Sequence, residues 1–156
     1  MTQPEFDAAL AHRRLSAAFF NEAWDLISKE SRTERENQLM VALAQASLCH
    51  WMKRPDCTDQ NLSIGYWQAA RVYTLAGVPA EAQRMARICL GYSDKLSPFY
   101  RGFAHEALAR AAALAGDVEA RDRHLTEARR LAAEVTDAEE RSMLESDLAT
   151  VGGGPR

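Results

Sequence analysis

The sequence predicts an all-α protein, and three observations support that fold class. Alanine, which has the highest helix propensity of the amino acids, fills 28 of the 156 positions. No segment alternates apolar and polar residues over the length of a half-buried strand. Helix-start and helix-stop residues recur along the chain and divide it into seven expected helices.

The first expected helix covers residues 4–28, with a proline in its first turn. Its apolar residues recur every three or four positions and are interrupted by Arg13, a pattern typical of a helix with one face toward the core. These apolar residues are Phe6, Leu10, Ala17, Phe20, Trp24 and Ile27. A second helix begins at the capping box of Thr33 and Glu36 and ends before Pro55.

Proline and glycine mark the ends of the next three helices. The third begins near Thr58 and is closed by Gly77, since glycine is favoured just beyond a helix end. Pro79 starts a short fourth helix. The fifth begins at Pro98, after a serine in the N-cap position, and ends at Gly116.

Two further helices complete the expected fold. Asp117 caps the sixth helix, and Thr136 and Glu139 form the capping box of the seventh. The glycine-rich residues 152–156 are expected to be a disordered tail. Residues 1–151 are therefore expected to form a single domain.

Composition and charge exclude several classes of protein. The formal net charge is −3, which argues against a nucleic-acid binder. No apolar run approaches the roughly 18 residues needed to span a bilayer, and the first residues do not resemble a secretory signal. The three cysteines lack C-x-x-C spacing, which is typical of reduced thiols. We therefore expect a cytoplasmic protein that binds neither nucleic acid nor membrane.

The sequence contains no recognisable motif for catalysis, a metal or a cofactor. His124 and Glu127 lie one helical turn apart, but a solvated pair explains them better than a metal site. Cys49 adjoins His50, yet neighbouring residues on a helix point about 100° apart. Cys49 is therefore expected to be a small core residue and not a nucleophile. These observations favour a protein without a metal, a cofactor or catalytic activity.

The stretch Ala70-Arg-Val-Tyr-Thr-Leu-Ala-Gly77, followed by Glu81-Ala82 and Ala86, resembles a tetratricopeptide repeat. Residues 108–116, followed by Glu119-Ala120 and Ala128, resemble a second, degenerate copy. The resemblance covers about residues 61–133, and the first two helices match it only in shape. It implies a right-handed superhelix of three antiparallel helical hairpins with a C-terminal capping helix.

The resemblance also implies a protein- or peptide-binding module that uses a concave groove. The first helix of each hairpin would line this groove. The partner-binding residues expected on this basis are Trp67, Gln68, Arg71, Tyr100, Arg101, His105, Glu106 and Arg110. The arginines would bind carboxylates or carbonyls of the partner, and Trp67 would supply apolar area. It also stays open that Trp67 packs between hairpins and that the arginines are ordinary solvated side chains.

Two other functions are compatible with the sequence. A closed polar cavity around His105, with Tyr66, Tyr100 and Arg13, would bind a small molecule or catalyse a reaction. A homodimer would instead form through exposed aromatic residues. Candidates for that interface are Phe19, Trp51 and Phe99.

Two local features remain to be explained by a structure. Gly65 lies inside an expected helix, where glycine costs about 1 kcal/mol relative to alanine, so close packing or ligand approach is expected there. The segment His12-Arg13-Arg14 places basic residues in an otherwise apolar helix. It is either a solvated basic turn or a place where Arg13 pairs with a carboxylate.

Overall fold

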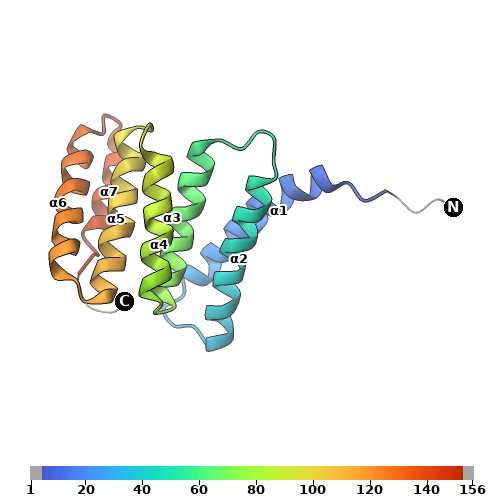
Figure 1. Cartoon of the computed structure of the whole chain (residues 1–156), viewed down its shortest axis with the longest axis horizontal. Helices are drawn as coiled ribbons and strands as arrows, with labels where there is room; N and C mark the ends of the chain where they lie inside the picture. The colour runs from blue at the N-terminus through green and yellow to red at the C-terminus, as the bar shows by residue number, and fades with distance from the viewer. Residues whose placement is uncertain (1–4, 153–156) are drawn as a thin grey trace.

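The computed structural model of the chain describes residues 5–152, and within this range it contains seven α-helices and no strands (Figure 1). This confirms the predicted all-α class. The helices are α1 (Ala8–Ile27), α2 (Glu34–Met52), α3 (Asp59–Leu75), α4 (Pro79–Ser93), α5 (Pro98–Ala115), α6 (Val118–Glu134) and α7 (Ala138–Leu148).

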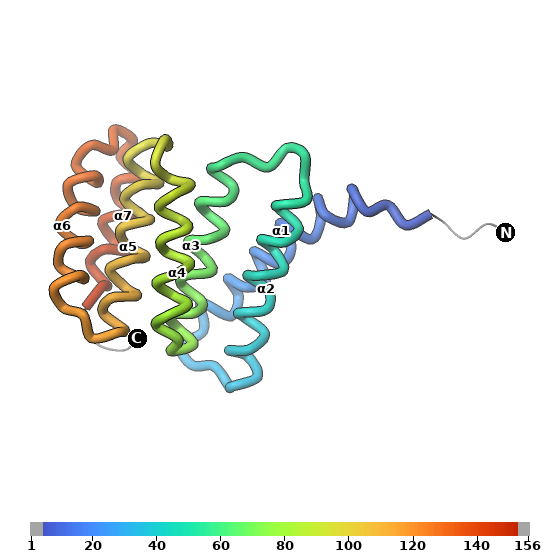
Figure 2. The backbone as a smooth tube through the Cα atoms, viewed as in Figure 1, coloured from blue at the N-terminus to red at the C-terminus, as the bar shows by residue number. Residues whose placement is uncertain are grey.

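Helices that are consecutive in the chain pack side by side. The pairs α1 and α2, α3 and α4, and α5 and α6 form helical hairpins, and each hairpin contacts the next through α2 with α3 and α4 with α5. Helix α3 also packs against α5, and α7 packs against both α5 and α6. The tube in Figure 2 shows the long connection between α2 and α3, which joins the first hairpin to the rest.

Most helix ends lie where local chemistry predicts them. The capping box of Thr33 and Glu36 is present at the start of α2, and Thr58 forms an equivalent pair with Asn61 at the start of α3. Gly77 and Gly116 have φ angles of 78° and 77°, the left-handed conformation that favours glycine. These caps depend on residues within one turn of the helix end, which is why the sequence alone predicts them.

Two helix starts differ from the prediction because aspartate takes the capping role. Helix α1 begins at Ala8, since Asp7 accepts a hydrogen bond of 2.9 Å from the N–H of Leu10. Helix α7 is capped by Asp137 and not by Thr136, with the Glu140 N–H donating at 2.9 Å. Residue 4, the expected first residue of the first helix, lies outside the described residues. So do residues 153–156, which make up most of the expected tail.

Small residues set the distances between the packed helices. A Cβ atom on Gly65 of α3 would lie 2.5 Å from a terminal carbon of Leu48 on α2. A Cβ atom on Gly102 of α5 would likewise lie 2.5 Å from a terminal carbon of Leu144 on α7. Close packing, one of the two explanations left open by the sequence, therefore accounts for Gly65. Several alanines at the helix crossings are fully buried for the same reason: Ala23, Ala69, Ala82, Ala86, Ala104, Ala109, Ala111 and Ala128.

The apolar stripe of the first helix is only partly buried. Helix α1 passes behind α2 in Figure 1, and its N-terminal end extends beyond α2, away from the other helices. Phe6 and Leu10 belong to this end and are 80% and 38% exposed. The expectation that these two residues face the core is therefore wrong, because no helix lies opposite them in the described part of the chain.

Candidate functional site

A groove of about 570 Å³ lies between α1, α3, α5 and α7, and we call it the aromatic groove. Its lining consists of Trp24, Ser63, Ile64, Trp67, Phe99, Tyr100, Phe103, Ser142, Met143, Ser146 and Asp147. Of these described lining residues, Asp147 alone carries a formal charge. The groove therefore offers a partner mainly apolar surface.

The aromatic side chains of the groove form one continuous wall. The ring of Trp67 lies 5.5 Å from that of Trp24 and 5.4 Å from that of Phe103, measured between centroids. Phe99 continues the row at 5.0 Å from Phe103, and Tyr100 lies 5.2 Å from Phe99. Such contacts between rings are favourable and rigid, so the wall is formed before any partner binds.

A second, smaller cavity of about 130 Å³ adjoins the aromatic groove at Ile64, which lines both. It lies where α1, the end of α2 and the start of α3 meet. Its lining is Ala17, Phe20, Asn21, Trp51, Asn61, Ile64 and Gly65. The two cavities together form an extended, mostly apolar surface.

A network of ionic groups next to the groove fixes the position of Trp67. Glu106 on α5 is fully buried and accepts hydrogen bonds from Trp67 Nε1 at 2.8 Å and from Arg71 Nη2 at 3.0 Å. Arg110 donates to the same carboxylate through Nε. A buried carboxylate is stable only with several charged or N–H donors, and Glu106 has three.

The network extends to α7 through Asp147. Arg71 Nη2 lies 3.3 Å from an Asp147 carboxylate oxygen, and Arg110 donates to the Asp147 carbonyl at 2.8 Å. Burial raises the pKa of the Asp147 carboxyl above its usual range, and the two guanidinium groups oppose this shift. Glu106 and the two arginines thus hold α3, α5 and α7 together behind the groove.

The eight residues expected to bind a partner occupy three different environments. Trp67 and Tyr100 line the aromatic groove. Arg71, Glu106 and Arg110 form the ionic network behind it, where their charges are paired with one another. The remaining three, Gln68, Arg101 and His105, are not among the residues that line the groove.

Gln68 lies on α3, is 1% exposed and faces α1. Its Nε2 donates a hydrogen bond of 2.9 Å to the carbonyl of Phe20, and its Oε1 is the one buried side-chain oxygen or nitrogen without a partner in the described residues. Gln68 therefore links the first hairpin to the second and does not lie on the groove surface.

His105 faces α6, where its Nδ1 lies 3.1 Å from Nδ1 of His124. Burial, together with the nearby His124, lowers the pKa of His105, and the Glu127 carboxylate acts in the opposite direction. An analogous contact joins His12 and His50, whose Nδ1 atoms are 2.8 Å apart. His105 thus contacts a second histidine and lines neither of the two cavities described above.

The cysteines do not contribute to the groove. Burial raises the pKa of the Cys89 thiol to about 12, so it is unreactive at neutral pH. Cys49 is exposed, and the expectation that it is a core residue is wrong. It lies on the outward face of α2, one position after the buried Leu48.

Sequence reasoning missed the contributions of α1 and α7 to the groove. Trp24 has the spacing of a core residue, and α7 looks like a polar capping helix. The serines and the methionine of α7 line the groove nevertheless, because α7 lies against α5. A signal was present in the spacing of Ser142, Met143 and Ser146, which places them on one helical stripe.

In residues 5–152, no group of three or more histidine, cysteine, aspartate or glutamate side chains is arranged to hold a metal ion. None of the described helices combines the length and the apolar character needed to cross a bilayer. No protein-family model matches the chain, and neither does any curated protein or solved structure.

Proposed function

We propose that this protein is a non-catalytic binding module that holds an apolar segment of a partner polypeptide in the aromatic groove. The observation that carries this proposal is the composition of the groove wall. Five aromatic rings from three helices line it, whereas the ionic groups behind it are paired with one another. Apolar area is therefore what the groove has to offer.

The shape of the surface favours a polypeptide over a compact ligand. The second cavity continues the groove past Ile64, so an occupant with two apolar side chains can fill both. An amphipathic helix that places spaced apolar anchors into a groove has this form. The proposal includes a tetratricopeptide-like stacking of the three hairpins and a cytoplasmic location, which suits three free cysteines.

The proposal changes the role first expected for the arginines. Arg71 and Arg110 are counter-ions of Glu106, and in this position they hold Trp67 and α7 in place. Separating them from a buried carboxylate in order to bind a partner would be costly. They are therefore positioning residues of the groove and not the groups that contact the partner.

Two exposed methionines provide a matched test. Met143 is 58% exposed and lines the groove, whereas Met52 is 50% exposed and lies at the end of α2, outside the groove lining. The binding of a panel of fluorescently labelled amphipathic helical peptides is measured by anisotropy. We expect Met143→Glu to weaken binding about tenfold or more, because a carboxylate loses hydration in an apolar contact. Met52→Glu should bind like the parent chain.

Equal weakening by both variants, or no binding of any peptide in the panel at millimolar concentration, would contradict the proposal. One observation favours a different ligand class, since a volume of about 570 Å³ also fits a small molecule. Native mass spectrometry of the gently purified protein separates these cases. A retained small molecule that is lost in Met143→Glu would replace the polypeptide as the occupant.

A further inference from the structure

The N-terminal end of α1 has an apolar and a basic part that the proposed function does not use. Leu10 lies in the first turn of α1 and Phe6 precedes the first residue of that helix by two positions; both side chains are exposed. Arg13 and Arg14 follow within one turn and are also exposed. Between residues 5 and 152, neither arginine has an ion-pair partner.

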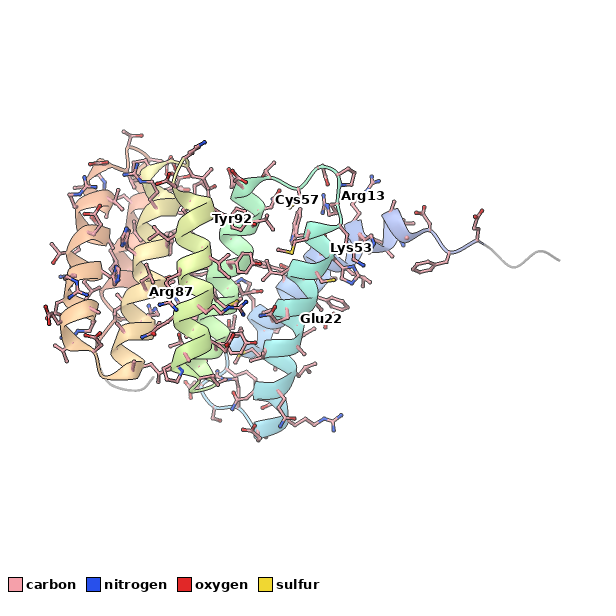
Figure 3. The ribbon with its side chains drawn as sticks, viewed as in Figure 1. Arg13, Glu22, Lys53, Cys57, Arg87 and Tyr92 are labelled. Atoms are coloured by element: carbon pink, nitrogen blue, oxygen red, sulfur yellow. The ribbon has the colours of Figure 1, made fainter. Side chains whose placement is uncertain are left out.

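Another basic group lies at the same end of the molecule. Lys53, which follows the last residue of α2, is near His50, and His50 contacts His12 of α1. Figure 3 draws Lys53 at the same end as Arg13. The extending end of α1 therefore combines two apolar anchors with a positively charged base. The acidic residues of this segment, Glu5 and Asp7, lie at its outer end, so its positive charge is confined to the base.

One edge of the aromatic groove carries the opposite charge. On α7, Glu139 lies on the same helical stripe as Ser142, Met143 and Ser146 of the groove, and Glu140 follows it. Burial and the nearby Glu140 carboxylate raise the pKa of the Tyr100 hydroxyl, so Glu140 lies beside the groove. In the described part of the chain neither carboxylate forms an ion pair. The groove is thus apolar inside and acidic along its α7 edge.

We propose that the exposed segment of residues 5–14, which leads into α1 and forms its first turns, docks into the aromatic groove of a second copy of this chain. The inference rests on the proposed function, because it assumes that the groove holds an apolar segment of a polypeptide. Phe6 and Leu10 are the anchors that enter the groove. Arg13 and Arg14 pair with the acidic α7 edge, where opposite charges fix the register of the segment.

The segment cannot enter the groove of its own chain. Helix α1 is continuous from Ala8 to Ile27, and Trp24 near its other end is part of the groove wall. Leu10 and Trp24 are fourteen positions apart, which corresponds to roughly 21 Å along a straight helix. The exposed end therefore points away from its own groove, and a second copy has to supply either the segment or the groove.

The contact is small, so association in the micromolar range is expected. Reciprocal docking of two copies gives a closed dimer, and one-way docking gives an open chain. Sedimentation equilibrium of the full chain from about 1 to 500 µM measures the association. The association should weaken several-fold in 0.5 M NaCl, because Arg13, Arg14 and Glu139 are solvent-exposed.

The decisive experiment uses two variants: one is altered in the docking segment and the other in the groove. Leu10→Glu keeps an intact groove and loses an anchor, whereas Met143→Glu keeps the segment and damages the groove. Each alone should remain monomeric at concentrations where the parent chain associates. A mixture of the two should form a 1:1 complex, because one intact segment then meets one intact groove. Leu39→Glu, at a 50% exposed leucine of α2, should associate like the parent chain.

Three results would overturn the inference: a parent chain that is monomeric at 500 µM, undiminished association of Leu10→Glu, or a mixture that stays monomeric. Restoration in the mixture also shows that both variants are folded. If the chain does not associate but peptides still bind in a Met143-dependent way, self-docking is wrong and the proposed function stands. If peptides do not bind either, both are wrong.

Discussion

At the scale of single residues, Glu106 decides how the groove wall is held. Its carboxylate is the common acceptor for Trp67, Arg71 and Arg110, and it is fully buried. Its oxygens have lost their contact with water, so the protein donors replace the whole of their hydration. Changing this residue should therefore affect stability and groove geometry together.

We predict that Glu106→Gln lowers the free energy of unfolding by about 3 kcal/mol or more, because two partly buried guanidinium groups lose their shared counter-ion. Urea denaturation measures this loss. Glu134→Gln is the matched control, since Glu134 pairs with Arg130 on the exposed face of α6 and should cost less than about 1 kcal/mol. Equal costs for the two variants would mean that burial of Glu106 does not stabilise the network.

The same residues show how far sequence reasoning extends at this scale. Helical register places Trp67, Arg71, Glu106 and Arg110 on the inner faces of their helices, and they do lie together in the structure. The spacing of Glu106 and Arg110 indicates their pair within α5, but nothing local places Arg71 on the same carboxylate, because Arg71 is 35 residues from Glu106. Because these charges pair with one another, Arg71, Glu106 and Arg110, which were expected to bind a partner, instead position the groove wall.

At the scale of helices, the ends were predictable and the packing was not. Caps depend on side chains within one turn, so α2, α3 and α6 begin as predicted. At α7 two candidate caps stand side by side, and Asp137 takes the role expected of Thr136. The spacing within α7 indicates which residues share a face, but not which helix that face contacts, because this is set by the packing of Gly102 of α5 against Leu144 of α7.

We predict that two glycine-to-alanine substitutions have opposite effects. At Gly91, in α4, an added Cβ meets no atom within 4 Å, so alanine should stabilise the chain by about 0.5–1 kcal/mol. At Gly102 the Cβ would lie 2.5 Å from Leu144, which is fully buried, so alanine should destabilise it by about 1–3 kcal/mol. Thermal denaturation measures both changes.

Gly102→Ala should also weaken peptide binding, because it displaces the helix that carries Met143 and Asp147. The additional substitution Leu144→Val, which removes one methylene, should recover part of the loss in binding. A Gly102→Ala variant as stable as the parent chain, with unchanged binding, would show that the contact between α5 and α7 does not position the groove.

At the scale of the whole molecule, the four histidines form two pairs, each between the two helices of one hairpin. His12 and His50 join α1 to α2, and His105 and His124 join α5 to α6. In a neutral pair one Nδ1 donates and the other accepts. When both rings are protonated, two positive charges face each other across the hairpin. The fold therefore contains two contacts that acid weakens.

The pKa values of His50, His105 and His124 are all lowered, mainly by burial. An unfolded histidine titrates near pH 6.5, so below that pH the unfolded chain binds more protons than the folded chain. The free energy of unfolding should therefore decrease as the pH is lowered, by up to about 1.4 kcal/mol per pH unit for each extra proton that the unfolded chain binds. Urea midpoints between pH 7.5 and 5 test this, and His124→Gln should reduce the slope. An unchanged slope would show that the His105–His124 pair does not cause the acid sensitivity.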